Sequence, residues 1–365
     1  MRFPEFCGEW ETKSINDLAD VIGGGTPDTT VKSYWDGEIQ WFTPSEIGKN
    51  KFVDASLRTI TEDGLNNSSA KLLPPNTILL SSRATIGECS LSLRECATNQ
   101  GFQSLVSKKC NIDFLYYLIQ TKKKDLIRKS CGSTFLEISA NEVRKIQVSV
   151  PSDVEQQKIA ELLSLIDKRI ATQNKIIKKY ESLIKGIAQH CIKESTSVNT
   201  YVKLGDICQI TTGKLDANAQ IDNGIYPFFT CAEQPFKIDS FAFDTEALLI
   251  SGNGANLGYI NYYNGKFNAY QRTYVLDIFS ENIQYVKWAL KVLLPKRIAI
   301  EKSSSNTPYI VLSTLSDLRL PIPNKSNQCH IAKLMQSLER KLSSQIALNG
   351  SYNKLKLYLL RQMFI

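Results

Sequence analysis

The sequence predicts an α+β protein in which two similar domains are separated by two long antiparallel coiled-coil helices, with a pseudo-two-fold internal repeat. Three observations lead to this prediction. The chain has 365 residues, enough for about two domains. A helical segment that follows Pro151 recurs after Pro323, 172 positions later. In both copies the apolar residues follow the heptad spacing that is typical of paired helices.

The repeat keeps its register across both helical segments without a gap. Residues 146–151 (Ile-Gln-Val-Ser-Val-Pro) match residues 318–323 (Leu-Arg-Leu-Pro-Ile-Pro). The same offset pairs Gln156 with Gln328, Ile166 with Leu338, Gln173 with Gln345, and Tyr180 with Tyr352. Because the period is the size of a domain, we expect a tandem pair and not a solenoid of short repeats.

Composition and charge set only broad limits. A hydrophobic content of 42% is enough for a core in each half, and no apolar run is long enough to span a membrane. Nine cysteines without CxxC spacing, and a first segment unlike a signal peptide, favour a cytoplasmic protein with reduced thiols. Residues 323–365 carry seven Lys and Arg against one acidic residue, a net +6 out of the +8 of the whole chain. A solvated helix face explains this excess as well as a nucleic-acid partner does.

Each half is predicted to open with a short helical piece, at residues 15–22 and 204–210, that runs into a glycine turn. Short strands and one further helix follow. The strands are expected at residues 78–82, 101–106, 248–252 and 273–278, and the helices at residues 114–128 and 283–300.

The two long segments have a narrow apolar stripe with one polar member. The predicted pairing residues are Leu163, Ile166, Ile170, Gln173, Ile177, Tyr180 and Ile184 in the first segment, and Leu338, Leu342, Gln345, Tyr352 and Leu359 in the second. About 37 residues at ~1.5 Å each give helices roughly 55 Å long. Such helices are marginal alone, so we expect them to bury their stripes against each other, with Gln173 and Gln345 setting the register. The predicted boundaries are 1–150 and 196–322 for the domains, and 151–195 and 323–365 for the helices.

Residues that could support catalysis are scarce. The chain has two histidines, His190 and His330, no GxxxxGK[ST] loop, and no Asn/Asp-Pro-Pro-aromatic motif of amino-methyltransferases. An antiparallel pair would bring His190–Cys191 close to Cys329–His330, but the spacing is not that of a zinc fold. We therefore expect no metal site and no catalytic set.

Several motifs together resemble the specificity (S) subunits of type I restriction–modification systems. They are Ser-Arg-Ala-Thr-Ile-Gly at 82–87, Ala-Thr-Asn-Gln-Gly-Phe at 97–102, Gly-Ser-Thr-Phe at 132–135 with Ile-Ser at 138–139, and Glu-Gln-Gln-Lys-Ile-Ala at 155–160. The resemblance covers essentially the whole chain. The second half departs from it: Ser-Arg-Ala-Thr becomes Ser-Gly-Asn-Gly at 251–254, and Thr-Asn-Gln-Gly becomes Ala-Tyr-Gln-Arg at 269–272.

The resemblance implies a non-catalytic adaptor with two target-recognition domains. Such subunits bind a bipartite asymmetric site on double-stranded DNA, and their helices dock two methyltransferase (M) subunits. Restriction (R) subunits complete the complex. S-adenosylmethionine and ATP with magnesium belong to those partners, so no cofactor is expected in this chain.

Candidate DNA-binding residues lie in turns next to the predicted strands, where side chains can reach base edges or phosphates. They are Thr26, Arg83, Asn99, Gln100, Ser133 and Thr134 in the first domain, and Lys214, Asn253, Gln271, Arg272 and Asn306 in the second. Asn and Gln in turns also cap backbone groups, and Arg83 could instead hold a structural carboxylate.

Two other classes of function stay open. One is a single-chain methyltransferase or nuclease, which methyl transfer by the purified chain alone would support. The other is a coiled-coil scaffold that joins two ligand-binding domains without DNA recognition. DNA binding that weakens steeply with salt would separate the DNA-recognition hypothesis from this scaffold.

Overall fold

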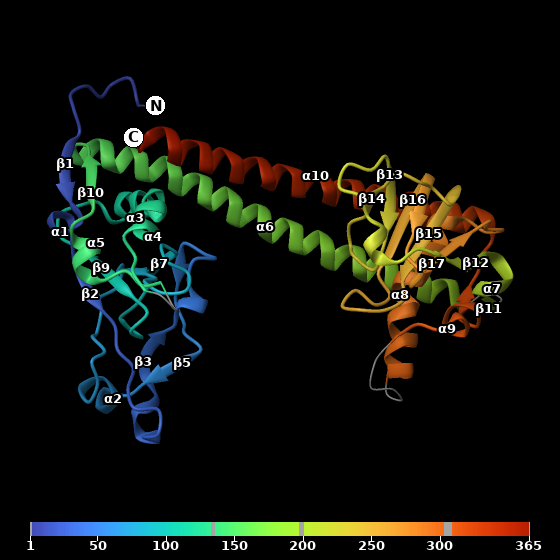
Figure 1. Cartoon of the computed structure of the whole chain (residues 1–365), viewed down its shortest axis with the longest axis horizontal. Helices are drawn as coiled ribbons and strands as arrows, with labels where there is room; N and C mark the ends of the chain where they lie inside the picture. Colours follow the sequence, from blue (N-terminus) through green and yellow to red (C-terminus); the bar gives the residue numbers. More distant parts are fainter. Residues whose placement is uncertain (1, 133–135, 197–200, 303–308, 365) are drawn as a thin grey trace. The chain divides into compact units, whose positions relative to one another are not determined.

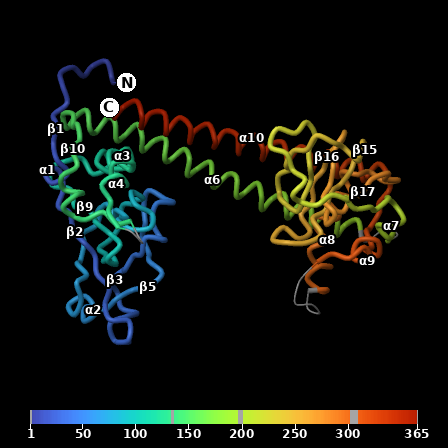
Figure 2. The backbone as a smooth tube through the Cα atoms, in the orientation of Figure 1, coloured from blue at the N-terminus to red at the C-terminus, as the bar shows by residue number. Residues whose placement is uncertain are grey.

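The fold was determined as a computed structural model, which describes residues 2–132, 136–196, 201–302 and 309–364. The chain forms two compact units (Figure 1). Unit 1 contains Met1–Asn174 and Ala347–Ile365, and unit 2 contains Lys175–Ile346. The backbone leaves unit 1 along one long helix and returns to it along another (Figure 2). Each unit therefore holds one domain and part of both long helices.

Unit 1 is built on a five-stranded sheet of order β2-β9-β6-β7-β4, with a three-stranded sheet β5-β3-β8 and the pair β1-β10. Its strands are β1 (Glu11–Ser14), β2 (Ala19–Gly23), β3 (Trp35–Phe42), β4 (Phe52–Val53), β5 (Arg58–Ile60), β6 (Ile78–Leu80), β7 (Cys89–Ser92), β8 (Cys96–Thr98), β9 (Gln103–Ser107) and β10 (Gln147–Val150). Its short helices are α1 (Ile15–Leu18), α2 (Glu62–Asn66), α3 (Ile112–Thr121), α4 (Lys123–Arg128) and α5 (Ala140–Arg144), with 3₁₀ turns at Lys32–Tyr34 and Pro44–Glu46.

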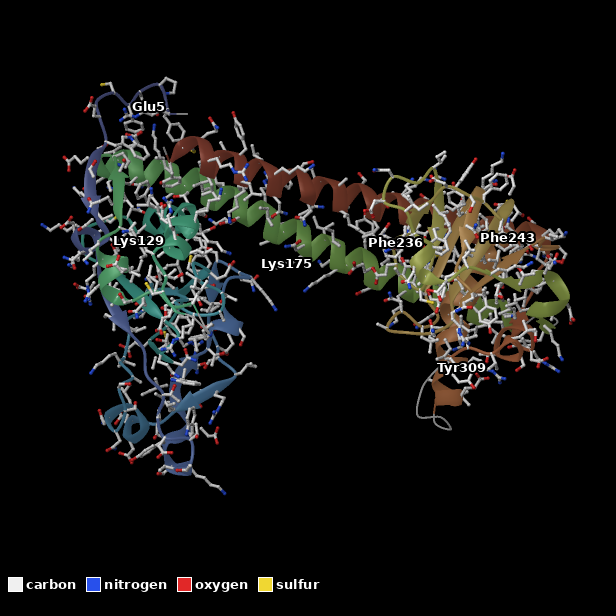
Figure 3. All side chains as sticks on the ribbon, viewed as in Figure 1. Glu5, Lys129, Lys175, Phe236, Phe243 and Tyr309 are labelled. Carbon is white, nitrogen blue, oxygen red and sulfur yellow. The ribbon has the colours of Figure 1, made fainter. Side chains whose placement is uncertain are left out.

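Unit 2 is built on a six-stranded sheet of order β12-β17-β15-β16-β13-β14, with the pair β11-β18. Its strands are β11 (Tyr201–Lys203), β12 (Gln209–Thr212), β13 (Tyr226–Phe229), β14 (Phe236–Ile238), β15 (Phe243–Ser251), β16 (Ile260–Ala269), β17 (Thr273–Asp277) and β18 (Arg319–Pro321). Its short helices are α7 (Leu204–Ile207), α8 (Ile283–Lys302) and α9 (Leu312–Ser316), with a 3₁₀ turn at Ala217–Ala219. Phe243, labelled in Figure 3, stacks on Phe267 with ring centroids 5.1 Å apart.

The internal repeat is confirmed by hydrogen bonds that occur at matching places in both units. The Gln156 Oε1 accepts from the Asn111 N–H at 3.0 Å, and the Gln156 Nε2 donates to the Pro151 carbonyl at 3.0 Å. Gln328 makes the same two bonds, to Asn282 at 3.0 Å and to Pro323 at 2.9 Å. The strand order β2-β9-β6-β7 of unit 1 also matches β12-β17-β15-β16 of unit 2. The two domains are therefore two versions of one fold.

Three predicted helices differ from the structure. The helical piece at 15–22 was wrong beyond Leu18, because Ala19–Gly23 is strand β2 and pairs with β9. The piece at 204–210 ends at Ile207 for the same reason, since β12 pairs with β17. The helix at 114–128 is two helices, α3 and α4, that meet at Lys122. In the first two cases sheet pairing overrides a local helical pattern.

The long helices are α6 (Asp153–Thr196, 44 residues) and α10 (Lys325–Met363, 39 residues). Within unit 1, Leu163 and Ile166 of α6 share a core with Leu359 of α10. Within unit 2, Ile184 of α6 clusters with Met335 of α10, and Leu338 and Leu342 pack against this cluster. The early part of α6 therefore lies beside the late part of α10, and the late part of α6 beside the early part of α10. This confirms the predicted antiparallel pair.

Alanine at Gly186 or Gly350 is expected to stabilise the protein. Both glycines are exposed inside a long helix, and a Cβ at either position would meet nothing within 4 Å. Alanine loses less conformational entropy on folding than glycine, so each change should raise the free energy of unfolding by roughly 0.5–1 kcal/mol. Chemical denaturation measures this. A decrease would show that these helix positions are sterically restricted.

Candidate nucleic-acid interface

In unit 1 the glycine turn after β2 packs against the turn after β8. The Gly25 N–H donates to the Thr98 carbonyl at 2.8 Å. A Cβ on Gly24 would lie only 2.0 Å from the Asn99 carbonyl oxygen, so the close approach requires glycine. This contact brings Thr26 to Gln100, whose Oε1 accepts a hydrogen bond from the Thr26 hydroxyl. The Asn99 Oδ1 accepts from the Gly101 N–H at 2.9 Å.

Arg83 joins the same group of turns but is partly committed to the protein. The Ser82 N–H donates to the Gly101 carbonyl at 2.8 Å, which places Arg83 beside the turn of Asn99 and Gln100. The Arg83 guanidinium forms an ion pair with Glu137 at 2.9 Å, which is the structural role considered from the sequence. Ser133 and Thr134 lie outside the described residues. Cys131 and Glu137, on either side of them, pair through two backbone hydrogen bonds of 2.9 Å.

In unit 2 the equivalent turns bring Lys214, Asn253, Gln271 and Arg272 together. The Gln271 N–H donates to the Leu215 carbonyl at 2.9 Å. The Gly252 N–H donates to the Arg272 carbonyl at 2.8 Å, so Asn253 lies next to Arg272. Asn306 lies outside the described residues.

The cationic side chains in the turns of unit 2 are less compensated than Arg83 in the turns of unit 1. Lys214 and Arg272 are exposed, and no carboxylate of the described residues forms an ion pair with either. Burial raises the pKa of the neighbouring Tyr274, and the positive charge of Arg272 opposes that rise. The Tyr274 hydroxyl therefore stays protonated and donates to the Ile310 carbonyl at 2.9 Å.

The two groups of turns share one hydrogen-bonded frame, which we call the recognition frame. In unit 1 the frame joins Ser82 to Gly101 and Ile138; in unit 2 it joins Gly252 to Arg272 and Ile310. The Ile138 N–H donates to the Ser82 carbonyl at 3.1 Å, and the Ile310 N–H donates to the Gly252 carbonyl at 2.9 Å.

The shared frame corrects one pairing made from the sequence. The motif alignment pairs Ser82 with Ser251. The Gly87 N–H donates to the Ser81 carbonyl at 3.1 Å, and the Gly258 N–H donates to the Ser251 carbonyl at 2.8 Å. Ser251 therefore corresponds to Ser81, one place earlier. Arg83 therefore corresponds to Asn253 and not to Gly252.

A second repeat, which the sequence analysis missed, borders both frames. Phe-Thr-Pro-Ser-Glu at 42–46 corresponds to Phe-Thr-Cys-Ala-Glu at 229–233. The Asn99 N–H donates to the Phe42 carbonyl at 3.1 Å, and the Tyr270 N–H donates to the Phe229 carbonyl at 2.9 Å. This repeat brings Cys231 to Asn253, whose Oδ1 accepts from the thiol at 3.0 Å. The shared Phe-Thr and Glu residues could have indicated this second repeat from the sequence. Their offset differs from the 172 positions of the main repeat, so the alignment of the main repeat does not pair them.

The predicted helix-pairing residues are sheltered along α6 and α10. Those below a tenth exposed are Leu163, Ile166, Gln173, Ile184 and Leu359, and those of intermediate exposure are Ile170, Ile177, Tyr180, Leu338, Leu342, Gln345 and Tyr352. Gln173 belongs to unit 1 and Gln345 to unit 2. Their meeting remains a prediction.

Unit 1 also has a charged network where its domain meets the helices. Lys356, on the apolar seam of α10, forms an ion pair with Asp167 of α6 at 2.7 Å. The Tyr117 hydroxyl donates to Asp167 at 2.6 Å, and burial together with that carboxylate raises the pKa of Tyr117. A cleft of about 740 Å³ lies beside this network. The pairing with Asp167 explains how the seam accommodates a lysine.

Within the described ranges, no cluster of three or more His, Cys, Asp or Glu side chains could bind a metal ion. A search of the same ranges finds no helix with the length and apolar character needed to span a bilayer.

Comparisons with known proteins agree with both the repeat and the fold. The family model of the type I restriction modification DNA specificity domain matches residues 8–182 and again residues 198–349. The chain is 29% identical to the type I restriction enzyme MjaIX specificity subunit of Methanocaldococcus jannaschii, over 92% of this chain and 88% of that protein. It is 42% identical to the EcoDI specificity subunit of Escherichia coli, over 39% of this chain and 32% of that protein.

A solved structure has the same fold over the whole length. The S subunit of a type I restriction-modification system from M. genitalium superimposes with a TM-score of 0.65 at 18% identity, covering 100% of this chain and 99% of that one. The two family matches fall on the two halves that carry the two recognition frames. The chain therefore belongs to the type I restriction-modification DNA specificity family and carries two copies of the family's domain.

Proposed function

We propose that this chain is the DNA specificity subunit of a type I restriction–modification complex, and that each recognition frame reads one half of a bipartite, asymmetric target. The observation that carries the proposal is one hydrogen-bonded frame built twice with different side chains. Arg83 and Asn99 in the first frame become Asn253 and Tyr270 in the second, while Gln100 is matched by Gln271. A shared frame supports a common mode of docking on the duplex, and different side chains support different half-sites.

The long helices are the proposed docking surface for two methyltransferase subunits, with restriction subunits completing the complex. Their buried stripes face each other within each unit, yet several large apolar side chains remain on their outer faces. These are Leu165, Leu183, Leu334, Leu348, Leu355 and Leu357. A series of exposed leucines on a helix pair is typical of a surface that a protein partner covers.

The chemistry is proposed to lie on those partners, in the cytoplasm. S-adenosylmethionine and ATP with magnesium would be bound there, and this chain would supply only recognition and spacing. Both histidines, His190 and His330, are exposed on the long helices and not in the recognition frames. The purified chain alone is therefore expected to bind DNA in a salt-sensitive way without transferring methyl groups.

An exchange of domains tests the proposal. Replacing residues 1–150 by the first domain of a related specificity subunit should change one half of the methylated sequence and leave the other half intact. The reciprocal exchange of residues 196–322 is the matched control and should change only the other half. Genome-wide mapping of methylated adenines in the host provides the measurement. A change in both halves after either exchange would contradict the proposal that each frame reads one half-site.

A further inference from the structure

Three amide side chains of the two recognition frames have their carbonyl oxygens hydrogen-bonded to the protein. The Gly101 N–H can only donate, so its bond to Asn99 at 2.9 Å identifies the accepting atom as the Asn99 Oδ1. The Gln100 Oε1 accepts from the Thr26 hydroxyl, and the Asn253 Oδ1 accepts from the Cys231 thiol at 3.0 Å. In all three side chains, one end of the amide is thereby occupied.

The other end of each amide faces solvent. Across the described part of the chain, the Asn99 Nδ2, the Gln100 Nε2 and the Asn253 Nδ2 donate no hydrogen bond. Neither Asn99 nor Asn253 contributes a buried polar atom without a partner, and Gln100 is exposed as a whole. Their amino groups are therefore solvent-accessible donors. Lys214 and Arg272 of the second frame can only donate as well.

We propose that both recognition frames present hydrogen-bond donors and therefore contact acceptor groups of duplex DNA. Those acceptors are guanine O6 and N7, adenine N7, thymine O4 and the phosphate oxygens. The cytosine and adenine amino groups are donors and do not fit these positions. The inference rests on the proposed function. It adds that the DNA groups contacted by the frames are hydrogen-bond acceptors. The Gly101 N–H acts as the positioning group in the first frame, because it can only donate and so fixes which end of the Asn99 amide is exposed.

An Asn99→Asp substitution in the chain assembled with its methyltransferase partners tests the first frame. Aspartate keeps the oxygen that accepts from the Gly101 N–H, but it replaces the exposed amino donor by a second oxygen. Duplex binding should weaken roughly ten-fold or more. The substitution removes the donor and places a carboxylate oxygen, which is an acceptor, opposite an acceptor of the DNA. Asn253→Asp should have the same effect in the second frame, where aspartate can still accept from the Cys231 thiol.

Two controls separate the loss of a donor from the added negative charge. Asn16→Asp adds the same charge to an exposed residue of α1, in the same unit but outside the frame, and should leave binding within about two-fold of the unchanged protein. Gln100→Met removes the donor without adding charge and should still weaken binding.

The pattern of the loss identifies the acceptor. A base contact is indicated if the Gln100→Met complex loses preference at one position of the half-site, and a phosphate contact if binding weakens equally on all sequences. Wild-type affinity and an unchanged methylated sequence for both Asn99→Asp and Gln100→Met would overturn the inference. If the unsubstituted complex showed no salt-sensitive binding to duplex DNA, the proposed function itself would fail.

Discussion

Replacing Gly213 by alanine is expected to abolish recognition of one half-site and leave the other intact. A Cβ at this position would lie 1.9 Å from the Ala269 carbonyl oxygen, 2.2 Å from its carbonyl carbon and 2.6 Å from the Tyr270 carbonyl oxygen. All three are backbone atoms, so no side-chain rotation can relieve the clash. Either the end of β12 or the turn after β16 must move, and that turn carries Gln271 and Arg272. The substitution therefore disturbs the second frame directly.

The expected cost is roughly 3 kcal/mol or more of the unfolding free energy of unit 2, at the upper end of what overpacking usually costs. Calorimetry would follow unit 2, and mapping of methylated adenines would follow recognition. Gly24→Ala is the matched change in unit 1, where the Cβ would lie 2.0 Å from the Asn99 carbonyl oxygen, and it should affect the other half-site. A Gly213→Ala protein that still recognises both half-sites would show that the turn packing is not required.

The second large effect is expected for Gln156→Leu, which should lower the free energy of unfolding by about 2–4 kcal/mol. Gln156 is 3% exposed. Leucine fills a similar volume but can neither accept from the Asn111 N–H nor donate to the Pro151 carbonyl. Each buried polar group left without its partner costs about 1–3 kcal/mol. The same bonds tie α3 to the first turn of α6, so the loss should also loosen the domain on its helix.

Gln157 supplies the control, because it is the next residue in α6 and is exposed. Among the described residues its Nε2 bonds only to Glu161, at 2.9 Å, so Gln157→Leu should change the unfolding free energy by less than about 0.5 kcal/mol. Gln328→Leu repeats the experiment in unit 2, where the side chain is 1% exposed and makes the corresponding bonds. Urea denaturation measures all three variants. Equal stabilities for Gln156→Leu and Gln157→Leu would refute the explanation that the hydrogen bonds of the buried Gln156 side chain stabilise unit 1.

The long helices could be predicted because their signal is local and repeated. A seam of alternating three- and four-residue steps specifies an amphipathic helix without knowledge of its partner, and the matching copy implied the pairing. The short elements were harder. Ala19–Gly23 follows a helical turn in sequence, yet it is a strand because β9 lies beside it. A segment of five residues has too weak a preference of its own to resist such pairing.

The candidate recognition residues were found in part because most follow a strand or border a turn. The sequence did not indicate that Arg83 would be paired with Glu137, or that Cys231 would contact Asn253. Both contacts join residues from separate turns, and neither pair has a characteristic spacing. The Phe-Thr-x-x-Glu repeat at 42–46 and 229–233 is visible in the sequence, but its offset differs from the 172 positions of the main repeat.

By itself, then, the sequence determined that the chain is a duplicated α+β module on a pair of antiparallel helices, because periodicity and repetition are properties of the order of residues alone. Only the tertiary structure decided which candidate side chains are already engaged by the protein, as Arg83 is by Glu137 and Asn253 is by Cys231. Such contacts join separate turns, so they exist only once the chain has folded.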